Sequence, residues 1–119
     1  MSIQTLLQAN ADRRQKLIAE AQRLAAIFYA LGALDVWIFG SVANDTVMPS
    51  SDLDLAVVLL APKGGDAPGT RFQQARSLVA AAEPTVPLDL LIVRPGAIEN
   101  AIQRGDLMWQ NARSYSMIT

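Results

Sequence analysis

Residues 36–60 read VWIFGSVANDTVMPSSDLDLAVVLL and contain two apolar runs joined by a short polar connection. The first run ends at Gly40 and Ser41, and two aspartates, Asp52 and Asp54, open the second run. Val, Ile, Trp and Phe favour a pleated, buried setting, so both runs are predicted to be β-strands. The second run is continuously apolar after Asp54, which is typical of a central strand covered on both faces.

The sequence before this stretch predicts a long helix. Apolar residues recur there at three- and four-residue steps, Ser2 is a suitable N-cap, and Gly32 stands where a helix ends. The sequence after it predicts a second helix with Thr70 as N-cap and Phe72 on its packed side. We interpret the charged residues of the first helix as a solvated face. They are Asp12, Arg13, Arg14, Lys16, Glu20 and Arg23.

The expected fold class is α+β, with a small mixed sheet and helices packed on it. The length predicts one domain over 1–119, with a long N-terminal helix at about 2–31, a core at about 35–93, and a C-terminal helix and tail at 96–119. The expected helices are 2–31, 70–82 and 97–104, the expected strands are 35–39, 53–60 and 87–93, and 106–110 is a candidate edge strand.

The overall composition narrows the class of protein. Apolar residues make up 51% of the 119, which excludes a disordered chain. No apolar run approaches the roughly 20 residues of a membrane helix, and no signal-peptide pattern opens the chain, so a cytoplasmic protein without membrane contact is expected. Ten basic and eleven acidic residues give no electrostatic reason to expect direct nucleic-acid binding.

The chain contains neither cysteine nor histidine. This excludes disulfides, thiolate zinc sites and the Ser-His-Asp and Cys-His types of catalysis. Any general base must be a carboxylate, lysine or tyrosine. Any metal must be bound by oxygen, which favours magnesium, manganese or calcium.

Three aspartates enter or interrupt the predicted strands. Asp52 and Asp54 are two residues apart, so their side chains leave the same face of a strand, roughly 6.5–7 Å apart along it. A third aspartate, Asp89, interrupts the apolar strand 87–93 and completes the cluster if that strand lies beside the second one. Carboxylates gathered on one face repel each other unless cations bind between them, which is the physical argument for magnesium.

Gly40 and Ser41 lie where the first strand ends. Glycine lets the backbone approach a ligand closely because it has no side chain. The amides that follow, together with the Ser41 hydroxyl, are suitable donors to phosphate oxygens. A phosphate site beside a carboxylate metal site is the arrangement that nucleoside triphosphate chemistry requires.

The spacing of these motifs is similar to that of a known superfamily. Gly40-Ser41, ten residues, and then Asp52-Leu53-Asp54 match the GS-x10-D-x-D pattern of the DNA polymerase β-like nucleotidyltransferases, and Asp89 stands where that superfamily has its third metal ligand. The chain most resembles the minimal nucleotidyltransferases of prokaryotes, which are single catalytic domains of about this length. The resemblance covers roughly residues 15–110 and implies the palm-like fold of polymerase β.

The resemblance implies a mechanism and roles for these residues. Asp52, Asp54 and Asp89 would be the catalytic metal ligands for two magnesium ions, with manganese as a substitute, and Asp89 would assist deprotonation of an acceptor hydroxyl. Gly40 and Ser41 would bind the triphosphate of the nucleotide, with ATP expected. The acceptor oxygen would attack the α-phosphorus, and pyrophosphate would leave.

The resemblance also implies a partner. In several bacterial pairs the minimal nucleotidyltransferase is an antitoxin, and it resembles enzymes that transfer AMP onto a tyrosine of a helical HEPN-type ribonuclease toxin encoded beside it. Independently, a domain this small that uses its cleft for metal and triphosphate has little surface left to enclose an acceptor. We therefore expect a partner protein that is the substrate or binds it, and a homo-oligomer is compatible with this expectation.

The loop after Gly-Ser departs from the family pattern. The family commonly has arginines there, whereas this chain has Val42-Ala43-Asn44-Asp45. Another positively charged group would then have to bind the phosphates. The candidates are a group of a partner protein and four residues of this chain. Those residues are Lys63, Arg71, Arg76 and Arg104.

Two alternative functions remain. One is a binding module of the same fold, weak in catalysis, that neutralises its partner by contact. The other is the catalytic subunit of a nucleotidyltransferase that acts on a small molecule such as an aminoglycoside. Trp37 and Trp109 are interpreted as core or interface residues, and Tyr29 and Tyr115 receive no catalytic role.

Overall fold

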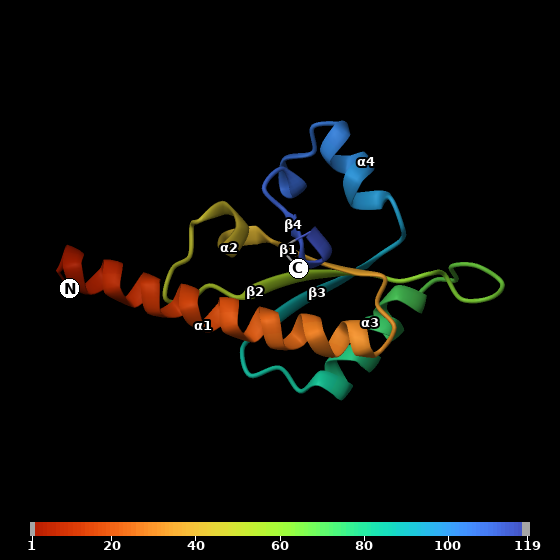
Figure 1. The fold of residues 1–119 in the computed structure, drawn as a ribbon, viewed down its shortest axis with the longest axis horizontal. Coiled ribbons are helices and arrows are strands. Elements are labelled where there is room, and N and C mark those ends of the chain that lie inside the picture. Colours follow the sequence, from red (N-terminus) through yellow and green to blue (C-terminus); the bar gives the residue numbers. More distant parts are fainter. Residues whose placement is uncertain (1, 118–119) are drawn as a thin grey trace.

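The computed structural model describes residues 2–117 and confirms the α+β class, with helices on both faces of a four-stranded mixed sheet (Figure 1). Two 3-10 helices, η1 (Leu107–Trp109) and η2 (Tyr115–Met117), follow the last α-helix. The α-helices are α1 (Ile3–Ala30), α2 (Gly40–Asn44), α3 (Thr70–Ala82) and α4 (Ala97–Gln103), and the strands are β1 (Asp35–Phe39), β2 (Leu53–Val58), β3 (Leu88–Val93) and β4 (Arg113–Ser114).

The sheet has the strand order β3-β2-β1-β4. β1 pairs with β2 and with β4 in antiparallel orientation, and β2 pairs with β3 in parallel orientation. The prediction of a central second strand is confirmed, because β2 lies between β1 and β3. β3 is an outer strand, and among residues 2–117 it pairs with β2 alone.

Two buried clusters cover the two faces of the sheet. The larger lies under α1 and α3, where Leu24, Phe28 and Leu78 pack against Leu55 and other side chains of the strands. In Figure 1 both of these helices lie below the sheet and α4 lies above it. The smaller cluster lies on the α4 side. It contains Trp37, Phe39, Ala56, Val58, Ile98, Ala101 and Trp109, so the interpretation of both tryptophans as buried residues is confirmed.

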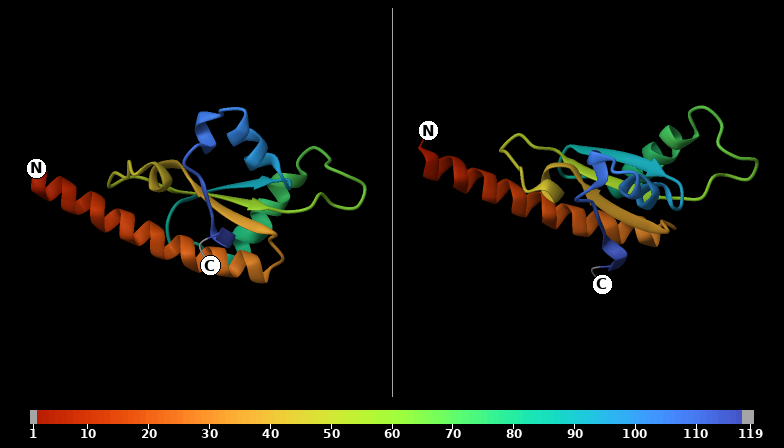
Figure 2. Two further views of the ribbon diagram at one scale, coloured as in Figure 1. Left: turned by 45° about the horizontal axis from the view of Figure 1, so that its top comes forward. Right: turned by 90° about the horizontal axis from the view of Figure 1, so that it is seen from above.

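The first helix agrees with the prediction in its ends and differs in its packing. The Ser2 side chain accepts a hydrogen bond from the Thr5 amide, and Gly32 follows the helix with φ of +105°. The first half of α1 extends past the sheet (Figure 2). For this reason Leu6 and Leu7 are exposed, although they share the period of the packed residues. Within residues 2–117, no helix has both the length and the apolar character needed to cross a membrane.

The interpretation of Glu20 as part of a solvated face was wrong. Its side chain is only 5% exposed. It accepts hydrogen bonds from the Arg23 guanidinium at 2.6 and 2.8 Å and from the Thr85 amide. Arg23 also donates to the carbonyls of Ala82 and Glu83, so this ion pair joins α1 to the end of α3.

Two expectations for α3 were wrong. The N-cap is Gly69 with φ of +84°, and Thr70 is the first helical residue. Phe72 is 67% exposed, because α3 turns that side away from the larger cluster. The Arg76 guanidinium lies 5.8 Å from the Phe72 ring centroid.

The C-terminal segment also differs from the prediction. Residues 107–109 form η1 in place of a strand, because the Asp106 side chain accepts a hydrogen bond from the Met108 amide and closes a turn. The fourth strand lies at Arg113–Ser114 and pairs with β1. The Ser114 hydroxyl donates to the Asp35 carboxylate, which contributes to anchoring this two-residue strand.

Candidate active site

The sheet brings two of the three predicted carboxylates, Asp54 and Asp89, to one face. Asp54 pairs with Phe39 of β1 on one side and with Asp89 of β3 on the other. Side chains alternate between the faces of a strand. Since Leu53 and Leu55 point into the larger cluster, Asp54 points to the opposite face. Asp89 lies on that face for the same reason, because its neighbours on β3 pack against the larger cluster.

Asp54 and Asp89 lie close enough to share a hydrogen bond. The pKa of Asp54 is raised to about 6, chiefly by burial and then by the charge of Asp89, the hydrogen bond with it and the charge of Asp52. A hydrogen bond from the backbone amide of Ser41 opposes the rise. Asp52 and Asp89 are exposed and Asp54 is half-buried. Three negative charges thus act on one another at a site open to solvent.

Gly40 touches the Asp54 carboxylate with its backbone. Its φ is +71°, a conformation that glycine adopts without steric cost. A Cβ at this position would lie 2.7 Å from Asp54 Cγ and still closer to Asp54 Oδ2. The Gly-Ser loop and the carboxylate are therefore in direct contact, and no residue with a side chain fits between them.

Ser41 faces the same carboxylate and has an unused hydroxyl. Its amide donates to Asp54, while its Oγ is buried and has no hydrogen-bond partner among residues 2–117. Buried polar groups in proteins are usually hydrogen-bonded. An oxygen of a bound phosphate, or of the water around a metal ion, would satisfy this hydroxyl.

The donor set suits a hard divalent cation. All candidate ligands are carboxylate or hydroxyl oxygens, the kind that Mg²⁺ prefers. Asp54 and Asp89 are adjacent, and a cation between them would relieve the repulsion that raises the pKa of Asp54. Within the described residues, no three acidic side chains are already arranged around a metal position. Asp52 would have to turn toward the pair, and its exposed place just before β2 allows this.

Two arginines of α1 position the loops around the site, and the sequence analysis did not assign them this role. Arg13 donates through Nε and Nη2 to the Ser51 carbonyl at 3.0 and 2.8 Å, next to Asp52. Arg14 Nε lies 3.3 Å from Asp45 Oδ1 at the end of α2. Both contacts join residues more than thirty positions apart, so no local sequence pattern signals them.

The cations proposed from sequence are engaged or placed elsewhere. Arg71 pairs with Asp66 at 3.1 Å, and Arg76 lies over Phe72 on α3. Lys63 is in the exposed loop that follows β2, and Arg104 is the C-cap of α4. None of them follows Gly-Ser as the family's arginines do.

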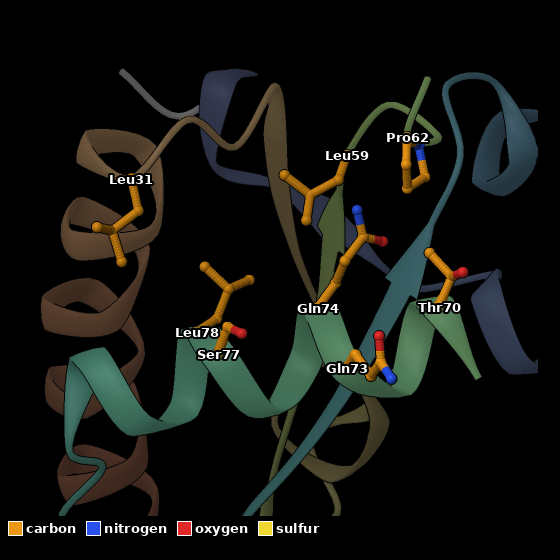
Figure 3. Close-up of a pocket in the computed structure, with 8 residues that line it drawn as sticks. All are labelled: Leu31, Leu59, Pro62, Thr70, Gln73, Gln74, Ser77 and Leu78. Atoms are coloured by element: carbon orange, nitrogen blue, oxygen red, sulfur yellow. The ribbon is translucent and has the colours of Figure 1, made fainter. Parts of the chain in front are cut away.

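The cavity drawn in Figure 3 lies at the other end of β2. Its volume is about 420 Å³, and it is bounded by Leu31 at the end of α1, Leu59 just after β2, and the α3 side chains Gln73 and Gln74. Its lining residues, all in the described part of the chain, include no acidic side chain. It is therefore separate from the carboxylate site.

Comparisons with known proteins identify the family and the fold of the chain. The sequence matches the family described as polymerase beta nucleotidyltransferase over residues 15–114. The chain therefore belongs to this nucleotidyltransferase family. A crystal structure from Sulfolobus solfataricus, of a protein with a provisional description as a nucleotidyltransferase, has a similar fold. It has a TM-score of 0.64 and 16% sequence identity, with 90% of this chain and 86% of that chain covered. No match was found among curated proteins.

Proposed function

We propose that the protein transfers AMP from ATP, with magnesium, onto a hydroxyl of a partner protein. The preferred acceptor is a tyrosine of a helical HEPN-type toxin, and the protein would act as the antitoxin. Family membership supports nucleotidyl transfer in general. The nucleotide, the metal and the acceptor are our proposals.

One observation carries the proposal. The carboxylates of Asp54 and Asp89 meet on one face of the sheet, directly against the backbone of Gly40. Ser41 donates its amide to Asp54, and its hydroxyl is buried without a partner among residues 2–117. Carboxylates suited to a divalent cation thus lie beside a loop suited to a phosphate, which supports transfer from a nucleoside triphosphate.

Each residue would have a distinct role. Asp52 and Asp54 would bind magnesium, which when bound offsets the charge of the triphosphate and lowers the pKa of the acceptor hydroxyl. Gly40 and Ser41 would orient the triphosphate. Asp89 would also be a magnesium ligand, and it would take the proton as the acceptor oxygen bonds to the α-phosphorus. The bond from that phosphorus to the pyrophosphate oxygen breaks, and the proton passes to solvent.

The test uses ATP labelled at the α-phosphate, magnesium, and a helical HEPN-type protein, which the proposal expects to be encoded beside this chain. We expect the label on a tyrosine of that protein. The double change Asp52→Asn with Asp54→Asn should abolish labelling, whereas Glu99→Gln, which neutralises an exposed acid on α4, should leave it intact. Equal labelling by the double variant would refute the assigned roles.

A second candidate function is neutralisation of the partner by contact alone. The observation that favours it is the Gly-Ser loop, which lacks the family's arginines and ends in the 85% exposed Asp45. Under this reading the double variant would still form the complex and still suppress the partner's activity. Suppression that requires ATP and both aspartates would exclude it.

A further inference from the structure

β3 has a free backbone edge. β2 donates from the Leu53 amide to the Pro87 carbonyl at 3.0 Å and from the Leu59 amide to the Val93 carbonyl at 3.1 Å. In a parallel pair, alternate residues direct both backbone groups to the same neighbour. Residues 87, 89, 91 and 93 therefore face β2, and the amides and carbonyls of 88, 90 and 92 point outward. Within residues 2–117, no fifth strand pairs with this edge.

The edge lacks the features that usually prevent pairing with another chain. Outer strands commonly have lysine, proline, a bulge or a covering segment. β3 reads LDLLIV, with Asp89 as its one charge, and it is paired with β2 without a bulge over all six residues. Leu91, which lies on the same face of the sheet as Asp89, has a side chain that is 39% exposed. Such an edge is a template for an additional strand.

A groove runs along this edge on the α3 side of the sheet. It lies between α3 and β3, has a volume of about 460 Å³, and has an apolar floor that includes Val79 and Leu90. Asp89 is also among its lining residues, but its side chain projects to the opposite face of the sheet, so the groove and the carboxylate cluster lie on the two sides of β3. Phe72 and Arg76 form its rim, and Arg76 has no acidic partner in the described part of the chain.

We propose that this groove and the free edge of β3 bind an extended segment of the acceptor polypeptide as a fifth strand. This inference rests on the proposed function and identifies how its acceptor docks. Outward backbone groups require an extended peptide, because only a strand satisfies them in register. Apolar side chains of the segment enter the groove, and an acidic side chain pairs with Arg76.

The pairing also places the acceptor hydroxyl. Adjacent strands lie about 4.8 Å apart, and side chains at paired positions share a face of the sheet. A residue paired with Asp89 therefore projects onto the face that carries Asp54, with its Cβ about 5 Å from that of Asp89. A hydroxyl-bearing residue at this position, or two residues away on the same face, is presented to the carboxylates.

The test uses nine-residue synthetic peptides with alternating apolar residues and a central tyrosine, serine or threonine, with and without an acidic residue. Binding is measured by fluorescence anisotropy without nucleotide or metal. We expect binding to slow amide exchange at residues 88, 90 and 92. Leu90→Pro removes an outward amide that has no bond in the sheet, and Leu90→Ala is the matched control for the lost side chain. Leu90→Pro should bind about tenfold more weakly than Leu90→Ala.

Two further variants keep the test decisive. Leu88→Pro against Leu88→Ala repeats the comparison at the neighbouring outward amide if Leu90→Pro fails to fold in a thermal unfolding control. Arg76→Glu should abolish the preference for peptides with an acidic residue. Absence of binding by every peptide, equal binding by the proline and alanine variants, or protection of other amides would overturn the proposal.

Oligomeric state and activity separate the remaining outcomes. A concentration-dependent dimer in sedimentation that Leu90→Pro abolishes would assign the edge to a second copy of this chain and overturn the proposal. Label transfer that is unchanged in Leu90→Pro would refute the docking site and leave the proposed function intact. Peptide binding at β3 without any label transfer would refute the proposed function and leave the docking site intact.

Discussion

Gly40→Ala adds one carbon atom where the Gly-Ser loop touches Asp54. The φ of +71° makes any side chain costly, by about 1–2 kcal/mol for an L-residue in this conformation. The new Cβ would also lie 2.7 Å from Asp54 Cγ, so the carboxylate must move away from Ser41 and Asp89. A displacement of about 1 Å in a catalytic constellation can cost on the order of a hundredfold in rate.

Gly105→Ala is the matched control for this change. Gly105 follows α4 with φ of +79°, and no atom within 4 Å would meet its Cβ. Gly105→Ala should lose about 1–2 kcal/mol of unfolding free energy in urea denaturation from backbone strain, and Gly40→Ala should lose more, since its Cβ also meets Asp54. Gly40→Ala alone should lose binding of magnesium and a non-hydrolysable ATP analogue in calorimetry. Equal nucleotide binding by the two variants would refute the close contact between Gly40 and Asp54.

Three further changes test contacts that support the site. The bonds from Arg23 and Thr85 lower the pKa of Glu20 to about 2. Its stabilisation is therefore complete above about pH 4.5 and is lost as the pH falls toward 2. Glu20→Gln should cost about 1–2 kcal/mol at pH 7, less than the shift alone implies because Arg23 is 41% exposed. Urea denaturation should show the difference between the two proteins shrinking below pH 4.5 and disappearing as the pH approaches 2. Arg13→Ala should weaken magnesium binding several-fold through the loop that carries Asp52, at a cost of about 1 kcal/mol in stability; calorimetry that shows unchanged binding would contradict this. The Arg94 guanidinium donates hydrogen bonds to Asp66 and to the Leu59 and Leu60 carbonyls. Arg94→Lys should therefore speed amide exchange in residues 61–69. Unchanged exchange there would show that the loop does not depend on Arg94.

Local sequence patterns were sufficient for most of the secondary structure. β1 begins and ends at the predicted residues, because an apolar run bounded by Asp35 and Gly40 specifies both ends. The sequence predicted Asp54 and Asp89 on two strands, and their meeting depended on the third strand lying beside the second, which the parallel pairing of β2 with β3 shows. The catalytic roles of these residues stay predictions.

The features that the sequence did not reveal depend on contacts between distant residues. Glu20 is charged and lies on a helix, yet Thr85 and Arg23 make its burial favourable. β4 has two residues and no strand pattern of its own, and its pairing with β1 and the bond from Ser114 to Asp35 define it. The groove beside β3 depends on where α3 turns Phe72, which propensity does not determine.

The central claim is that Asp52, Asp54 and Asp89 bind divalent cations beside the Gly-Ser loop. Crystals grown with manganese and a non-hydrolysable ATP analogue would test it by anomalous diffraction. The account predicts manganese bonded to carboxylate oxygens of Asp54 and Asp89, with a phosphate oxygen near the Ser41 hydroxyl. Manganese bound away from these carboxylates, or a triphosphate bound elsewhere on the molecule, would contradict it.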